Sequence, residues 1–121
     1  MTDSMGFDAQ ITFLYVADLA RSSAFYGDLL GLELVRDQGV CLIYRVSADA
    51  YIGLCGHRPA EPGGMIVTLV TDDVDGWAER LRAGGHAVEG PEANARFELY
   101  HCFAHDPDGH VVEIQRFDDP I

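Results

Sequence analysis

The chain contains one order of predicted elements twice, and this internal repeat restricts its fold more than any other feature. One apolar run of strand length leads into Val16-Ala17-Asp18-Leu19, and another leads into Val70-Thr71-Asp72-Asp73-Val74. In each copy an aspartate stands where a helical pattern begins, as is typical of a helix N-cap. Two copies are too few for a solenoid, and a copy of about 50 residues is too short to bury a core of its own. The repeat therefore predicts two modules that pack together.

Each module is predicted to have the order βαβββ, so the expected fold class is α+β. Apolar periodicity and a Gly/Pro-rich break predict one domain over residues 1–121, with module one at about 10–56, a connector at 57–64 and module two at 65–117. The predicted strands are 11–16, 32–36, 40–46, 51–55, 65–71, 86–89, 96–104 and 110–116, and the predicted helices are 19–30 and 74–83. We expect a curved mixed sheet with the helices on its outer face and a cup-shaped site on the other face, where a small molecule would bind.

The charge balance excludes two classes of partner. Asp and Glu total 20 against 8 Lys and Arg, which makes the net charge −12 with neutral histidines. Nucleic acids and anionic membranes are bound mainly through clustered Lys and Arg, so we expect neither as a partner. The N-terminal residues do not resemble a secretory signal, and no apolar run approaches the roughly 20 residues of a membrane helix. Cys41, Cys55 and Cys102 are far apart in sequence and are expected to be free buried thiols, which favours a cytoplasmic location.

Two motifs carry a resemblance to a known family. The first is Val16-Ala17-Asp18-Leu19-x-x-Ser22-x-x-Phe25-Tyr26 followed by Leu29-Leu30-Gly31-Leu32, and the second is Asp106-Pro107-Asp108-Gly109-His110-x-x-Glu113. With the repeat, residues 10–117 resemble the vicinal oxygen chelate superfamily, which contains glyoxalase I, bleomycin and fosfomycin resistance proteins and extradiol dioxygenases. The resemblance implies a homodimer that binds a small-molecule ligand in the cup.

The resemblance also implies a divalent metal ion (Fe, Mn, Ni or Zn), with ligands from the first and last strands of each module. Glu113 stands at the last of these four positions, which is the only position that keeps a metal-binding side chain. The others fall on Ile11, on Met65 or Ile66, and on Gly53 or a neighbour, where no side chain can bind a metal. One carboxylate does not hold a catalytic divalent ion, so we expect the usual metal site to be largely lost.

His101 and Glu113 are the predicted catalytic residues. If the turn at 106–109 pairs residue 106 with residue 110, His101 lies opposite Gln115 and Phe103 lies opposite Glu113. The residues that would then share the open face are His101, Phe103, His105, Val111, Glu113 and Gln115. A slip of one residue would turn one strand over. In the first register His101 and Glu113 form a hydrogen-bonding pair or a general base, and the alternative is an ordinary contact inside a polar pocket.

The first strand adds aromatic residues to the predicted cup. Alternation places Ile11, Phe13 and Tyr15 on the open face. This favours a pocket for an apolar or planar compound, with the predicted substrate-binding residues Phe13, Tyr15, Phe103, His105 and Gln115. The alternative is that Phe13 or Tyr15 fills a seam between two subunits. Two other histidines, His57 and His86, are expected to be structural or to face solvent.

Two functions stay open. The first is an enzyme of the lyase, isomerase or dioxygenase type, in which Glu113 acts as a base and His101 or Tyr15 orients a carbonyl group. The second is a metal-free protein that sequesters a small aromatic or cationic compound, as the drug-resistance members of the superfamily do, with the net negative charge attracting a basic ligand. A dimeric scaffold without a ligand is a third reading. The retained carboxylate favours the enzyme.

Overall fold

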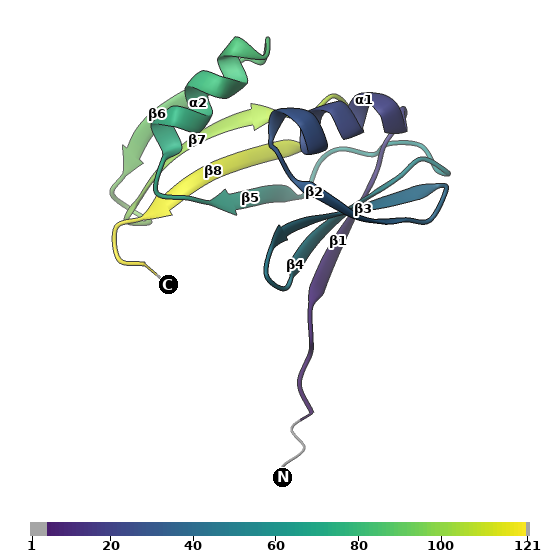
Figure 1. The fold of residues 1–121 in the computed structure, drawn as a ribbon. Helices are drawn as coiled ribbons and strands as arrows, with labels where there is room; N and C mark the ends of the chain where they lie inside the picture. Colours follow the sequence, from purple (N-terminus) through teal and green to yellow (C-terminus); the bar gives the residue numbers. More distant parts are fainter. Residues whose placement is uncertain (1–4, 121) are drawn as a thin grey trace. The chain divides into compact units, whose positions relative to one another are not determined.

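A computed structural model describes residues 5–120, which form two compact units that divide between Ala60 and Glu61 (Figure 1). Each unit has the order βαβββ, so the predicted α+β class and the duplication are confirmed. The first unit consists of β1 (Gln10–Tyr15), α1 (Leu19–Ser23), the π-helix η1 (Ala24–Leu29), β2 (Glu33–Asp37), β3 (Cys41–Ser47) and β4 (Ala50–Cys55). The second unit consists of β5 (Ile66–Val70), α2 (Val74–Ala83), β6 (Glu89–Asn94), β7 (Leu99–His105) and β8 (Val111–Phe117).

Each unit builds a four-stranded mixed sheet with the same connectivity. The strand orders are β1-β4-β3-β2 and β5-β8-β7-β6. The first strand of each unit runs parallel to the last one, β1 with β4 and β5 with β8, and the other pairs are antiparallel. A parallel pair needs a long crossover connection, which the helix and the intervening hairpin supply. The topology thus brings together the two strands of each module that the family resemblance singles out.

Both helices begin at the predicted aspartates. The Asp18 side chain accepts a hydrogen bond from the Arg21 backbone N–H at 3.1 Å, and the Asp73 side chain accepts one from the Gly76 N–H at 2.9 Å. In the first unit the predicted single helix is instead α1 followed by the wider π turns of η1, in which the N–H of Leu30 donates to a carbonyl oxygen five residues back. A π segment keeps the apolar residues inside, so the helical period of the sequence did not reveal it.

In the second unit, α2 packs against β7 and β8, as Figure 1 also shows. The helix contributes Val74, Ala78 and Leu81, each at most 1% exposed. The sheet residues that are buried with them are Cys102, Ala104, Val112 and Ile114, each at most 2% exposed. Burial of these alternate positions leaves the intervening side chains of β7 and β8 on the opposite face of the sheet.

Two predicted strands have an end displaced by three residues or more, whereas the ends of the others differ by one residue at most. The strand expected at 86–89 is instead β6, from Glu89 to Asn94. The sequence Gly90-Pro91 suggests a loop, but β6 lies at the edge of its sheet, where proline is tolerated. The strand expected at 96–104 begins only at Leu99, since residues 95–98 form a turn in which Glu98 has a φ of 55°.

The prediction of three free thiols is wrong for two of them. Cys41 and Cys55 occupy directly opposite positions of β3 and β4 and form a disulfide. Cys102 is free and buried. The predicted hairpin, centred near residue 48, already aligns positions 41 and 55, so the pairing could have been read from the hairpin register. The thiol argument for a cytoplasmic location is therefore lost. Across residues 5–120, no helix has the length and apolar character needed to cross a bilayer.

Candidate functional site

A tight turn sets the register of the β7–β8 hairpin, which carries most of the candidate residues. The backbone N–H of Asp106 donates to the His110 carbonyl oxygen, and the Asp106 carboxylate accepts from the His110 N–H, both at 2.9 Å. The bulge residue Gly109 has a φ of 89°, which a residue with a side chain adopts rarely. The resulting cross-strand pairs are His105–Val111, Phe103–Glu113 and His101–Gln115. This is the register predicted from the sequence, and it places His101 and Glu113 on the face away from α2.

A buried carboxylate stands at the centre of this face. The Nδ1 atom of His101 lies 2.7 Å from Oε2 of Glu113, and the two side chains are only 10% and 12% exposed. The Thr68 hydroxyl donates to the other carboxylate oxygen at 2.8 Å, from the neighbouring position on β5. Hydrogen bonds to a carboxylate strengthen where water is excluded. The pair expected from the sequence is thus present, and Thr68 is an addition that only the β5–β8 register could reveal.

The side chains around this carboxylate add an aromatic wall and an unused acceptor. The ring of Phe103 meets the imidazole of His101 edge to face, with the centroids 4.7 Å apart. Gln115 is 7% exposed, and its Oε1 atom has no hydrogen-bond partner among residues 5–120. A buried amide oxygen without a partner is costly unless a ligand or water satisfies it. His105 is exposed and pairs with Val111 at the far end of the hairpin.

The first unit presents an apolar and aromatic face. On β1, Ile11 and Phe13 are 41% and 46% exposed, whereas Leu14, which points to the other face, is 1% exposed. The predicted alternation along this strand is therefore confirmed. Phe13 lies directly over Gly53: a Cβ at Gly53 would sit 2.3 Å from the Phe13 ring. A pocket of about 460 Å³ opens on this unit and is lined by Ile11, Val35, Arg36, Gln38, Ile43, Arg45 and Tyr51.

The strand pairing identifies the equivalent positions of the two modules. Ile11 pairs with Tyr51, two positions before Gly53, and Ile66 pairs with Val111, two positions before Glu113. The same offset in both units makes Ile66, and not Met65, the counterpart of Ile11. The open alternative in the sequence is thereby resolved.

These positions do not suit the metal that the family resemblance implies. Ile11, Gly53 and Ile66 offer no ligand atom. Each oxygen of the remaining ligand, Glu113, already accepts a hydrogen bond. A hard divalent ion requires several oxygen or nitrogen ligands at once. The single carboxylate of Glu113 would therefore leave such an ion without enough ligands.

The sequence and the fold together match known proteins. The model of the Glyoxalase/Bleomycin resistance protein/Dioxygenase superfamily matches residues 9–114, and the chain belongs to this family. No curated protein matches it in sequence.

Solved structures of this family resemble the chain over most of their length. TnmS3, an antibiotic binding protein from Streptomyces sp. CB03234, is 30% identical with a TM-score of 0.80, over 94% of this chain and 98% of that one. A glyoxalase/bleomycin resistance protein from the same organism is 32% identical with a TM-score of 0.72, over 86% and 96%. Lactoylglutathione lyase from Agrobacterium tumefaciens is 25% identical with a TM-score of 0.74, over 93% and 96%. The similar proteins thus include both a binding protein and an enzyme.

Proposed function

We propose that the chain is a small-molecule-binding protein that holds an aromatic or cationic compound without a metal. The observation that carries the proposal is the Phe13 ring over Gly53. The family resemblance implies a metal ligand near this position, and here an aromatic ring covers a residue that has no side chain. In place of a residue that binds a metal, the strand thus offers an aromatic surface on which a planar compound can stack.

Three further features support a binding role. A pocket on the same unit as Phe13 has the volume of a small-molecule site, and apolar side chains together with Arg36 and Arg45 line it. The net charge of −12 attracts cations over long range. A protein that is 30% identical over 94% of the chain is an antibiotic binding protein. Of the predicted substrate-binding residues, Phe13 and Tyr15 lie on the first unit and belong to this proposal.

A thermal-shift screen with planar aromatic compounds, both cationic and neutral, would find a ligand, because binding to the folded state raises the melting temperature. Calorimetry would then compare Phe13→Ala with Phe97→Ala, since Phe97 is similarly exposed, at 59%, in the turn before β7. Phe13 is 46% exposed, so a ligand that covers its ring buries about half of a Phe side chain, which contributes roughly 0.7–1.5 kcal/mol, and Phe13→Ala should weaken binding roughly 3- to 13-fold. Phe97→Ala should leave the dissociation constant unchanged. Equal affinity for the wild type and Phe13→Ala would refute the proposal.

An enzyme is the second candidate, and the buried His101–Glu113 pair favours it. A carboxylate held by His101 and Thr68 could remove a proton from a carbon next to a carbonyl group, and the free acceptor of Gln115 could orient the substrate. Each ligand found in the screen would be incubated with the wild type and with Glu113→Gln. Turnover that disappears in the variant, with an unchanged dissociation constant, would assign Glu113 as the base of an enzyme of the lyase or isomerase type.

We also propose that the chain forms a homodimer, as the family resemblance implies, and that it works in the cytoplasm. Exposed apolar side chains on β5, Ile66 and Val70 at 53% and 61% exposure, support an interface. Light scattering after gel filtration measures the mass directly, and a monomer at micromolar concentration would contradict the dimer. In the reducing cytoplasm the disulfide of Cys41 and Cys55 would be reduced to two free thiols.

A further inference from the structure

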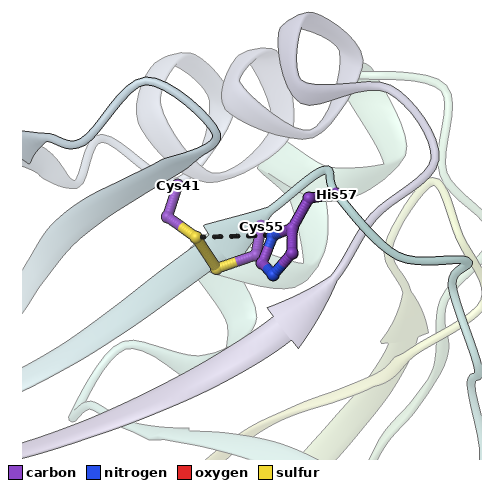
Figure 2. A group of neighbouring side chains, drawn as sticks. All are labelled: Cys41, Cys55 and His57. Carbon is purple, nitrogen blue, oxygen red and sulfur yellow. Dashed lines mark hydrogen bonds between the residues drawn. A yellow bond between two sulfur atoms is a disulfide. The ribbon is translucent and has the colours of Figure 1, made fainter.

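Two cysteines and a histidine meet at one end of the first unit's sheet. Cys41 opens β3 and Cys55 ends β4, directly opposite each other, with their Cα atoms 4.1 Å apart. His57 follows Cys55 by two residues, and its Nδ1 atom lies 4.0 Å from Sγ of Cys41 (Figure 2). The three potential ligand atoms all lie within 4.8 Å of one another. The predicted roles of these residues, free thiols and a structural or solvent-facing histidine, do not account for this convergence.

We propose that the reduced chain binds one zinc ion through Cys41, Cys55 and His57, and that formation of the Cys41–Cys55 disulfide releases it. This site is distinct from the metal positions that the family resemblance implies, and it does not depend on the proposed small-molecule function. Thiolate sulfur and imidazole nitrogen are the ligands that zinc prefers.

The geometry requires only a small movement of the thiols. In a tetrahedral site with Zn–S near 2.3 Å and Zn–N near 2.0–2.1 Å, neighbouring ligand atoms are roughly 3.5–3.8 Å apart. The Nδ1–Sγ separation of 4.0 Å is already close to this value. Once the disulfide is reduced, each sulfur can turn about its Cα–Cβ bond to reach the same separation, and the backbone of the two strands can stay in place.

Charge and burial also suit zinc. Cys41 and Cys55 are 8% and 3% exposed, and two isolated thiolates would be costly at such a place. Two thiolates, a neutral imidazole and Zn²⁺ sum to zero charge, which removes this cost. His57 is exposed and packs edge to face against Tyr15, with the ring centroids 5.7 Å apart. The fourth position of the ion would therefore be open to water or to a ligand from solution.

The redox step is a thiol–disulfide exchange. A cellular dithiol transfers two electrons and two protons to the Cys41–Cys55 disulfide and itself becomes a disulfide. The two cysteine thiols then lose their protons to solvent as their sulfurs bind Zn²⁺. Oxidation reverses both steps, so the sulfur–sulfur bond and the two zinc–sulfur bonds are mutually exclusive.

The test compares the two redox states of the tag-free full chain. One sample is reduced with a phosphine, which is then removed without oxygen, and the other is left oxidised. Zinc uptake is measured by competition with a chromophoric chelator. Cobalt replaces zinc as a spectroscopic probe, because thiolate-to-cobalt charge transfer and intense visible bands report tetrahedral sulfur ligation. We expect one zinc per reduced chain and none per oxidised chain. Equal uptake by both states would overturn the proposal, and this comparison needs no variant to fold.

Variants then assign the ligands. Cys41→Ser and Cys55→Ser should each at least halve the charge-transfer band, and the double variant should abolish it. Loss of a residue that only hydrogen-bonds to a metal ligand typically weakens metal binding roughly 10- to 100-fold. His57→Ala removes a ligand itself and should weaken zinc binding by more than that. The matched controls are Cys102→Ser and His86→Ala in the second unit, which should bind zinc as the wild type does. Burial raises the pKa of the Cys102 thiol, which keeps it protonated. Zinc affinity unchanged in His57→Ala, or lost in Cys102→Ser, would contradict the assigned ligand set.

Discussion

The buried contact between His101 and Glu113 should be worth far more to folding than an exposed ion pair of the same chain. The two groups are 2.7 Å apart with side chains about nine-tenths buried. A hydrogen bond to a charged group contributes about 1.5–3 kcal/mol, and exclusion of water favours the upper half of that range. The exposed Arg45–Glu33 pair spans 3.3 Å with side chains 40% and 71% exposed, and it should contribute at most about 1 kcal/mol.

A double-mutant cycle measures this difference. His101→Phe keeps a ring without a donor, and Glu113→Met keeps an unbranched chain without a charge. The hydrogen bond from Thr68 is lost in the single variant Glu113→Met and in the double variant alike, so its contribution to the free energy of unfolding cancels in the cycle. We expect a coupling energy of about 2–3 kcal/mol for His101–Glu113.

Urea unfolding at neutral pH would be followed by fluorescence of Trp77, the only tryptophan, which lies in α2 of the same unit. The midpoint should shift with an unchanged slope, since the same surface is exposed on unfolding. The Arg45–Glu33 cycle, followed by circular dichroism, is the control. A His101–Glu113 coupling below about 0.5 kcal/mol, which is the error of additivity, would refute the reasoning.

Three other predictions concern the second unit. Leu81→Ala removes a side chain with 0% exposure and should cost about 2–5 kcal/mol in chemical unfolding; a loss below 1 kcal/mol would mean that the site collapses around the smaller residue. Gly90→Ala should destabilise by more than about 1 kcal/mol, because φ is +89° and the new Cβ would lie 2.9 Å from the His101 carbonyl oxygen, and an unchanged melting temperature would contradict this. The hydroxyl of Tyr100 donates to Asp75 at 2.5 Å, which raises the Tyr100 pKa above its ordinary value of 10.0. The stabilisation from this bond is thus complete below the unfolded pKa and is lost as the pH rises through the folded pKa, and Asp75→Ala should move the ultraviolet titration of Tyr100 to lower pH.

Local signals in the sequence were sufficient for the elements and for one strand register. Asp18 and Asp73 marked the helix starts because an N-cap acts within the first helical turn. The turn that begins at Asp106 aligned His101 with Gln115 because a tight turn leaves a hairpin little choice of register. The predicted pair of His101 and Glu113 followed from that alignment alone. Its catalytic role stays a prediction.

Contacts between distant segments were decided only by the tertiary structure. The parallel pairing of β5 with β8 brings Thr68 to Glu113 across 45 residues, and the pairing of β1 with β4 lays Phe13 over Gly53. The position of His57 beside the Cys41–Cys55 disulfide depends on the start of the connector meeting the end of the β3–β4 hairpin.

The sequence by itself determined the duplicated βαβββ fold, the family and the loss of three of the four metal ligands implied by the resemblance. Each of these depends on periodicity, on capping within a few residues, or simply on which side chain occupies a position. The tertiary structure decided which side chains meet: Phe13 lies over Gly53, the Glu113 carboxylate is held by His101 and Thr68, and two cysteines converge with His57. A parallel register is set by the packing of a helix and a hairpin against the sheet, and that packing leaves no local trace in the sequence.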